Sequence, residues 1–335
     1  MTRATVTAPG WPVLLFAGCG ILFLLVLPPV LELSGHQYLL SLATRALIYA
    51  LAASSLNLIL GYGGMVSLGH AAFMGIGAYV VGILSHQAAG SGLLSPAAVQ
   101  GAGPVSALTA WPAAVALAML FALVTGVVSL RTRGMHFIMI TLAFAQMVYF
   151  FFISLESYGG SDGMVLANRD RLPGIDLGDD RVFYYLCLGL LLLFLAFVHR
   201  LVNARFGRVL VGCRENEKRL QVLGFATFGY RLLAYCLAGG AAGLAGALLA
   251  EQGGYVSPAM LHWTRSGELM VMVLLGGTGT LAGPVLGAFV LLFLEEYLAL
   301  YTEHWMVILG PVLVLAVLFA RGGLYPMLAG HGRER

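Results

Sequence analysis

The sequence predicts an all-α polytopic membrane protein of about ten transmembrane helices, with broken or half-helices at two glycine-rich points. Hydrophobic residues make up 60% of the chain and charged residues only 10%, against about 25% charged in ordinary globular domains. Apolar runs long enough to cross about 30 Å of hydrocarbon recur along the chain. Together these features indicate a single transmembrane domain over residues 1–335 rather than a soluble protein.

Nine apolar segments qualify as crossings, because a spanning helix needs roughly 20 apolar residues. The first is expected to be a retained helix rather than a cleaved signal peptide, since it is long, contains Pro28-Pro29 and lacks a clear cleavage site. A tenth segment, Leu269–Gly276, is too short to cross alone and is expected to be a half-helix or to continue through the following glycines. The nine segments are Val13–Leu31, Leu39–Leu60, Met65–Leu84, Pro112–Leu130, Met135–Ile153, Phe183–Val198, Leu232–Ala250, Val285–Leu300 and Trp305–Phe319.

Charge is distributed unevenly over the connecting loops. Residues 200–231 hold seven Lys and Arg against two acids, whereas residues 154–181 hold six acids against three Arg. Because basic loops stay in the cytoplasm, residues 200–231 are expected inside and residues 154–181 in the periplasm. Arg131, Arg133 and the 321–335 tail are expected inside as well. These assignments require ten crossings with both termini cytoplasmic; nine crossings, with one terminus outside, is the alternative.

A glycine cluster interrupts the apolar segment between Leu56 and Gly77. Lipid offers no hydrogen bonds to free backbone groups, so broken helices persist only where protein or a cavity surrounds them. Transporters place substrate sites at such breaks, which predicts a translocation pathway here. The candidate pathway residues are Gly63, Gly64, Ser67 and His70. For Ser67 a capping role is favoured, and for His70 a structural role is favoured over a pathway role.

The second glycine cluster resembles the first. Gly63–Leu68 and Gly276–Leu281 share the pattern Gly-Gly-x-x-Ser/Thr-Leu, and paired broken segments are typical of transporters built from internal repeats. Gly276, Gly277 and Thr280 therefore join the candidate pathway residues. Chance or close packing of small residues is the alternative explanation.

Two polar residues inside the expected spans have ordinary structural explanations. Asn57 is expected to form interhelical hydrogen bonds. Arg45 lies close to the outer end of its span, where its side chain can reach the interface.

The basic loop contains a second candidate site. A helix there would place Arg214, Lys218 and Gln221 on one face and Asn216, Leu220 and Leu223 on another. Glu215 would pair with Arg219, and Gly224 is a plausible helix stop. A short charged helix with a leucine edge suits docking into a partner's groove. The alternative, a solvated loop whose charges only set the membrane topology, is equally well supported.

Several classes of chemistry have no counterpart in the sequence. It contains no Gly-x-x-x-x-Gly-Lys-Ser/Thr phosphate loop, no nucleophile elbow and no paired carboxylates within a span. The four cysteines are scattered without metal-ligand spacing. The chain is therefore expected to be non-catalytic, with no cofactor, no metal and no nucleic-acid partner.

The run Gly61–Tyr79 closely resembles the LivM-type permeases of branched-chain amino acid ABC importers. Four further blocks, in the order of that family, also resemble it, so that the resemblance covers roughly residues 46–324. These blocks are Gly159–Gly163, Arg214–Glu217 with Leu223-Gly224, Ala242–Ala247 and Gly267–Pro284.

The resemblance implies a permease subunit of the bacterial inner membrane that passes branched-chain or related amino acids from a periplasmic binding protein. It implies a related second, LivH-like permease and two cytoplasmic ATPases that use ATP and Mg. A urea or short-amide ABC permease is the close alternative. An ion-coupled secondary transporter is less favoured, because His70 is the only plausible central titrating group.

The resemblance also implies roles for individual residues. Lys218 and Arg219 follow Glu217 where the general importer loop has two alanines, so contacts known from distant importers do not carry over. The Gly160-Ser161-Asp162-Gly163 run forms either a simple turn or a docking point for the binding protein. The residues implied in ATPase coupling are Arg214, Glu215, Asn216, Glu217, Leu220, Leu223 and Gly224.

Overall fold

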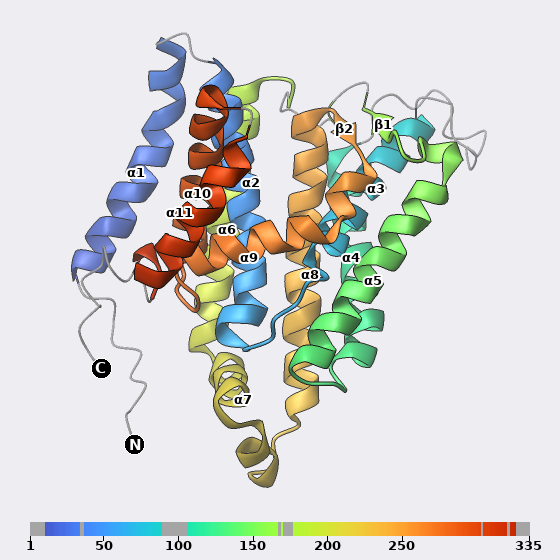
Figure 1. Cartoon of the computed structure of the whole chain (residues 1–335), viewed down its shortest axis with the longest axis vertical. Helices are drawn as coiled ribbons and strands as arrows, with labels where there is room; N and C mark the ends of the chain where they lie inside the picture. Colours follow the sequence, from blue (N-terminus) through green and yellow to red (C-terminus); the bar gives the residue numbers. More distant parts are fainter. Residues whose placement is uncertain are drawn as a thin grey trace.

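A computed structural model describes residues 11–33, 37–88, 106–166, 169, 177–302, 304–319 and 322–325 of the chain. Nearly all of this part is helical (Figure 1), and the predicted all-α class is confirmed. Much of the 154–181 loop and most of the 321–335 tail lie outside the described residues.

The described part contains eleven α-helices and a few shorter elements. The α-helices are α1 (Trp11–Leu33), α2 (Gln37–Asn57), α3 (His70–Ala88), α4 (Ala107–Ser129), α5 (Met135–Ser154), α6 (Asp180–Asn203), α7 (Arg205–Val222), α8 (Thr227–Gly253), α9 (Trp263–Gly276), α10 (Gly283–Tyr301) and α11 (Trp305–Phe319). Shorter elements are the turns η1 (Leu58–Tyr62), η2 (Glu156–Tyr158) and η3 (Pro258–Leu261) and the strands β1 (Met164–Val165) and β2 (Tyr255–Val256).

Six helices in the described part are long and apolar enough to cross a membrane: α2 with η1, α4, α5, α6, α8 and α10. The multi-pass prediction is therefore confirmed, whereas the count of ten stays a prediction. Several helix boundaries differ from those expected by up to six residues; α4, for example, begins at Ala107 rather than Pro112. The segment expected from Met65 becomes helical only at His70, and α9 starts at Trp263, six residues before the expected Leu269, because its first turns are polar and escape a hydropathy criterion.

Helix α8 forms the centre of the molecule and packs against α4, α3 and α2. Small residues let these backbones approach closely, as is typical of membrane helices. A Cβ at Gly246 would overlap the carbonyl oxygen of Met74 in α3, and one at Gly77 would overlap that of Gly243 in α8. This contact explains why the Ala242–Ala247 block consists of Gly and Ala at every position but Leu244.

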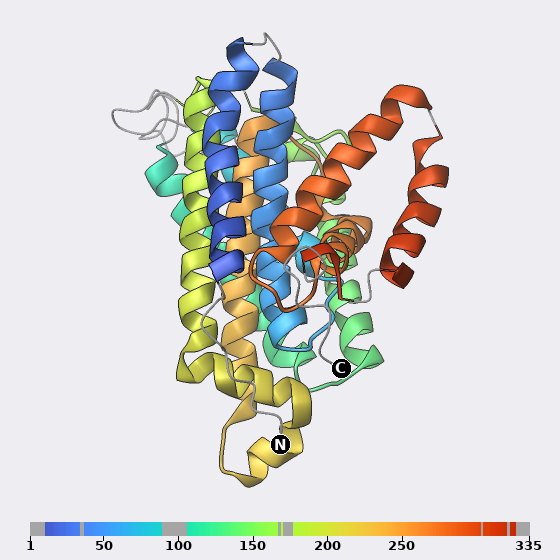
Figure 2. The same ribbon diagram turned by 90° about the vertical axis from the view of Figure 1, so that its left-hand side faces the viewer.

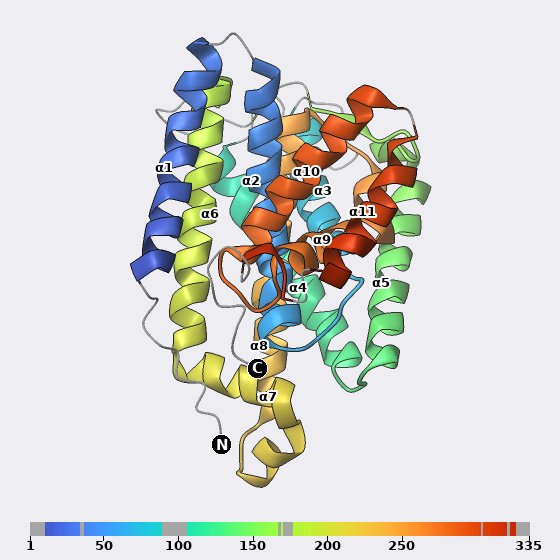
Figure 3. The ribbon, with the colours of Figure 1, turned by 60° about the vertical axis from the view of Figure 1, so that its left-hand side comes forward.

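Helix α2 is the second hub and is largely buried. It packs against α8, α10, α6 and α9. The short α9 runs crosswise through the middle of the molecule, with α10 and α11 beside it (Figures 1 and 3). The end of α2 and the end of α9, where the two glycine clusters lie, are thereby brought into the interior.

The two ends of the molecule differ in structure. Helix α7 extends beyond the long helices at one end (Figure 2). At the other end, β1 and β2 pair antiparallel, with Met164 opposite Val256 and Val165 opposite Tyr255. This pairing joins the loop after α5 to the end of α8, so the basic and acidic loops lie at opposite ends (Figure 1).

Candidate functional site

The first glycine cluster ends α2 through a widened turn. The helix changes to π-helical geometry over Leu58–Tyr62, and the N–H of Met65 donates to the carbonyl of Ile59 (2.9 Å). Gly64 has φ +66°, a left-handed conformation that residues with a Cβ resist. The predicted break at Gly63-Gly64 is present, and the chain runs without helix until His70.

The second cluster connects α9 to α10. Gly277 and Gly279 have φ values of +120° and +74°. The Thr280 hydroxyl donates to the carbonyl of Gly277 (2.8 Å) and accepts from the N–H of Gly283 (3.1 Å). Thr280 thus closes the loop and provides an acceptor for the first N–H group of α10. The second predicted break is also present.

Asn57 ties the two breaks together. Its amide nitrogen donates to the carbonyl of Thr280 (2.8 Å), and its amide oxygen accepts from the N–H of Gly279 (2.9 Å). A Cβ at Gly61 would overlap the backbone of Gly279, so the two chains touch directly. The hydrogen-bonding role expected of Asn57 is confirmed, and its partner is the other break.

Arg214 of α7 reaches this same point. Its guanidinium donates to the carbonyl oxygen of Gly61. A Cβ on Gly64 would lie 2.7 Å from Cγ of Arg214, and one on Gly279 would lie 3.7 Å from its Nη1. We call this group, which brings residues from three separate sequence blocks into contact, the break junction; it comprises Asn57, Gly61, Gly64, Arg214, Gly279 and Thr280.

Ser67 and His70 lie between the first break and α3. The Ser67 hydroxyl accepts from the N–H of Gly69 (3.2 Å), and Ser266 of α9 accepts from the N–H of Ala71 (2.8 Å). The His70 ring is fully buried, with Nε2 2.8 Å from the hydroxyl of Ser55. This geometry places His70 in the α2–α3 contact, which favours its structural role.

The expected single helix over residues 213–223 is wrong. Asn216 has extended dihedrals, φ −156° and ψ 93°, and its side chain accepts from the N–H of Arg219 (3.0 Å). Asn216 therefore caps a second, short helix. Arg214 and Lys218 do not share a helical face, and the Glu215–Arg219 pair is not formed. Polar groups that bond their own backbone compete with helix continuation.

The end of this second helix agrees with prediction. Gly224 has φ +86°. The N–H of Phe225 donates to the carbonyl of Leu220 (3.1 Å), and that of Gly224 to Gln221 (3.0 Å). These paired bonds form a Schellman motif, in which glycine supplies the left-handed residue. Gly224 is the helix stop.

Glu217 fixes the second helix to the body of the protein. Its carboxylate pairs with Arg231 at the start of α8 (3.1 Å) and with Arg133 of the α4–α5 connection (3.4 Å). The Thr227 hydroxyl donates to it as well (3.2 Å). Glu217 therefore points inward and holds the segment in position, rather than facing a partner directly.

The outer surface of this segment is apolar. Val222 is 88% exposed and Leu223 65% exposed, and Phe225 and Phe228 continue the patch. Leu220 is half-buried against Gly212. We call Val222, Leu223, Phe225 and Phe228 the apolar tip. The leucine edge predicted only Leu223 of these four residues, because the turn at Gly224 brings the others beside it.

The glycine-rich loop at the opposite end forms the expected turn. Gly159, Gly160 and Gly163 have φ values of +86°, +50° and +77°, and the N–H of Asp162 donates to the carbonyl of Gly159 (2.9 Å). Ser161 and Asp162 are exposed at its surface. Docking of a binding protein here stays a prediction.

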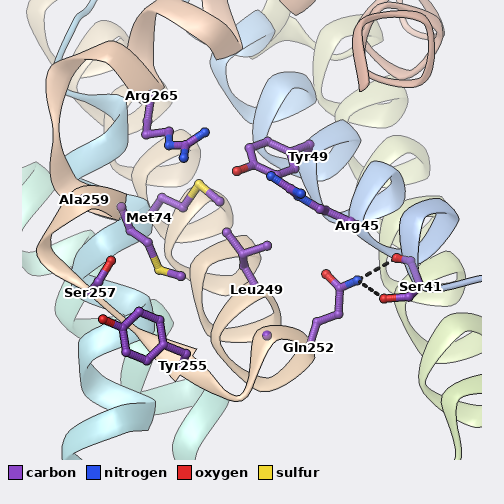
Figure 4. A pocket seen from close by; sticks show the side chains of 12 residues that line it. Ser41, Arg45, Tyr49, Met74, Leu249, Gln252, Tyr255, Ser257, Ala259 and Arg265 are labelled. Carbon is purple, nitrogen blue, oxygen red and sulfur yellow. Dashed lines mark hydrogen bonds between the residues drawn. The ribbon is translucent and has the colours of Figure 1, made fainter. Parts of the chain in front are cut away.

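The sequence did not predict a cavity of about 360 Å³ between α2, the end of α8, η3 and α9 (Figure 4). Arg45, Tyr49 and Arg265 line one part of it, and Met74, Leu249 and Met260 another. Arg45 was expected only to reach the interface. The cavity had no sequence signal, because its residues come from three separate stretches of the chain, namely residues 41–49, residue 74 and residues 249–265. Within the described ranges, no group of three His, Cys, Asp or Glu residues is placed to hold a metal ion.

The known proteins that resemble this chain are permease components of transport and import systems. Residues 38–317 match the family model for the permease component of branched-chain amino acid transport systems. The chain is 28% identical to the high-affinity branched-chain amino acid transport system permease protein LivM of Salmonella typhimurium and to that of Escherichia coli, over 85% of this chain and 69% of each relative. It is 35% identical to the autoinducer 2 import system permease protein LsrC of Klebsiella pneumoniae, over 40% of this chain and 41% of that protein. No solved structure matches the chain.

Proposed function

Because the chain belongs to the family of permease components of branched-chain amino acid transport systems, we propose that it carries branched-chain amino acids inward across the bacterial inner membrane. It is a non-catalytic permease subunit of an ABC importer, and its relatives are permeases of the same kind. A urea or short-amide substrate is not favoured, since the relatives matched over most of the chain are LivM proteins. The ion-coupled secondary transporter is not favoured for the same reason.

An importer of this kind works with ATPase and binding-protein partners. We propose the full set as a second, LivH-like permease, two cytoplasmic ATPases that use ATP and Mg, and a periplasmic binding protein. We further propose ten crossings with both termini in the cytoplasm. The α7 end then faces the ATPases, and the β1–β2 end faces the binding protein.

The observation that carries the mechanism is the path from the apolar tip to the break junction. The tip is exposed apolar surface of the kind that marks protein contacts. Glu217 holds it rigidly to α8, and Arg214, eight residues before Val222, bonds the carbonyl of Gly61. Motion of an ATPase bound at the tip therefore moves Arg214 against both breaks. The breaks contain left-handed glycines, so they can shift without unfolding a continuous helix.

A test is to replace Val222 and Leu223 together by Asp. Charges on this patch oppose burial in an apolar groove, so the double variant should insert normally but lose the ATPase on co-purification and lose ATP-driven leucine uptake. The matched control is Val165→Asp, a valine at the opposite end whose exposed fraction is 75%, and this variant should retain the ATPase. Normal uptake by the double variant would refute docking at the tip.

A further inference from the structure

The cavity of Figure 4 lies in the half of the molecule opposite to α7. Its residues come from α2, from Met74 of α3, and from the stretch that runs from the end of α8 through β2 and η3 into α9. Along α2, Tyr49 in the cavity is twelve residues before Gly61 in the break junction, which corresponds to about 18 Å of helix. The cavity and the break junction therefore lie on the same helix at different depths.

The lining of the cavity has two chemically distinct parts. Arg45 and Arg265 contribute guanidinium groups, with Tyr49, Gln252 and Ser257 as further polar residues. Met74, Leu249 and Met260 contribute apolar surface. None of the lining residues is an Asp or a Glu. A carboxylate on an aliphatic molecule would match both parts of this surface, and the hydroxyl oxygens of Tyr49 and Ser257 can accept hydrogen bonds from an ammonium group beside it.

The two arginines are held in place by contacts beside the cavity. Arg265 pairs through Nη1 with Glu268 (2.7 Å), and the guanidinium of Arg45 lies 5.7 Å from the centre of the Tyr49 ring. Glu295 is within electrostatic reach of both arginines, yet neither Glu268 nor Glu295 lines the cavity. A guanidinium has five N–H donors, so these contacts leave donors for a ligand.

Arg45, one of the two cavity arginines, lies within the candidate membrane span Gln37–Tyr62. Charged side chains within membrane helices are costly and characteristically mark substrate pathways. Arginine is also the side chain best suited to grip a carboxylate, through two parallel hydrogen bonds. The volume of about 360 Å³ falls at the lower end of the range of small-molecule sites, about 300–1,000 Å³. It has room for one small amino acid.

We propose that this cavity receives the amino acid released by the binding protein, with its carboxylate on Arg45 and Arg265 and its aliphatic side chain against Met74, Leu249 and Met260. The proposal rests on the proposed function and adds the site at which the permease first contacts its substrate. The cavity selects for a carboxylate through charge and for an apolar side chain through the methionines and leucine.

The charge of the cavity can be measured without transport. Ser257→Cys is introduced into a cysteine-free chain within the full transporter and labelled with two thiosulfonate reagents of similar size, one sulfonated and one quaternary ammonium. Two nearby cations should favour the anionic reagent about tenfold, and Arg45→Gln with Arg265→Gln should abolish the preference. Leucine at high concentration should slow labelling. Equal rates for both reagents before any arginine is removed would overturn the proposal.

Uptake provides the second measurement. Arg45→Gln and Arg265→Gln should each lower ATP-driven leucine uptake about tenfold or more, the effect of losing a charged hydrogen bond, while binding-protein-stimulated ATP hydrolysis persists. Arg131→Gln, an exposed arginine at the other end, should keep normal uptake. Normal uptake by both cavity variants would overturn the cavity site and leave the proposed function intact. Absence of ATP-driven leucine uptake in the unmodified complex would instead refute the proposed function.

Discussion

Arg214 occupies a position at which one side chain contacts the first break in the membrane helices and lies close to the second. Its guanidinium donates to the carbonyl of Gly61, and its aliphatic part lies against Gly64. Carbonyls at the end of a helix lack intrahelical donors, so a fixed cation there satisfies an otherwise free acceptor. A lysine or glutamine cannot reproduce the planar donor fork of arginine.

Replacement of Arg214 by Gln should therefore uncouple the permease. The Gly61 carbonyl loses a charged donor, a change of about 1.5–3 kcal/mol. We expect normal insertion and ATPase binding, but leucine uptake reduced about tenfold or more. Arg208→Gln is the control, because Arg208 is exposed on the same helix. Equal uptake by the Arg214 and Arg208 variants would contradict this role.

Cys213 reports on the packing of the same segment. Burial raises the pKa of its thiol, and the carboxylate of Glu217 raises it further. Since the thiolate is the reactive form, maleimide labelling of Cys213 as the sole cysteine should be slow at neutral pH. The labelling rate of Cys213 should increase only at a higher pH than that of a free cysteine, whose pKa is about 8.5.

Glu217→Gln should speed this labelling, because it removes the nearby negative charge and loosens the contact with Arg231. The control is Lys218→Gln, an exposed neighbour, which should leave the pH profile unchanged. The measurement is the rate of maleimide labelling of Cys213 at a series of pH values from neutral to alkaline. A profile identical to that of a free cysteine would show that Glu217 does not hold the segment.

At the scale of elements, the closest packing is between α3 and α8. Gly246 of α8 meets the carbonyl of Met74, and Gly77 of α3 meets that of Gly243. Membrane helices gain stability from such van der Waals contact rather than from a hydrophobic driving force. Any side chain at these points must move two helix backbones apart.

Gly246→Val should consequently destabilise the folded permease by about 3 kcal/mol, at the upper end of typical overpacking costs. Thermal unfolding in detergent should show a clearly lower midpoint. Gly189→Val in α6 is the matched control, since a Cβ there meets nothing within 4 Å. If both valine variants have the same unfolding midpoint as the unmodified protein, the α3–α8 contact is not as close as described.

The second half of α7, from Arg214 to Val222, shows where prediction at the scale of elements failed. Regular spacing predicted one helix, but the Asn216 side chain bonds the backbone N–H of Arg219 and starts a new one. The Gly224 stop was predicted correctly, because a glycine in left-handed conformation needs no distant partner. The role of Glu217 was not predictable, since Arg133 and Arg231 come from other helices.

At the scale of the whole molecule, two chemically different ends are separated by the length of the long helices. The basic segment with its apolar tip forms one end, and the β1–β2 pair with the glycine-rich turn forms the other (Figure 1). An importer needs this polarity, because substrate arrives on one side of the membrane and ATP is hydrolysed on the other.

Single cysteines should establish the orientation. Asn203→Cys and Ser161→Cys, each in a chain without native cysteines, lie at opposite ends and are exposed. A membrane-impermeant maleimide added to cells with a permeabilised outer membrane should label Ser161→Cys only. Asn203→Cys should react only after the inner membrane is opened. Labelling of Asn203→Cys from outside would reverse the proposed orientation.

From the sequence by itself came the helical membrane class, the positions of both glycine breaks and the basic character of residues 200–231. These features depend on local chemistry: apolar length, the backbone freedom of glycine and the clustering of charge. Only the tertiary structure showed that the breaks meet through Asn57, that Arg214 reaches both, and that Arg45 and Arg265 share a cavity. These contacts join residues as much as about 220 positions apart, and sequence spacing carries no information on such pairs, because they arise only when separate helices pack.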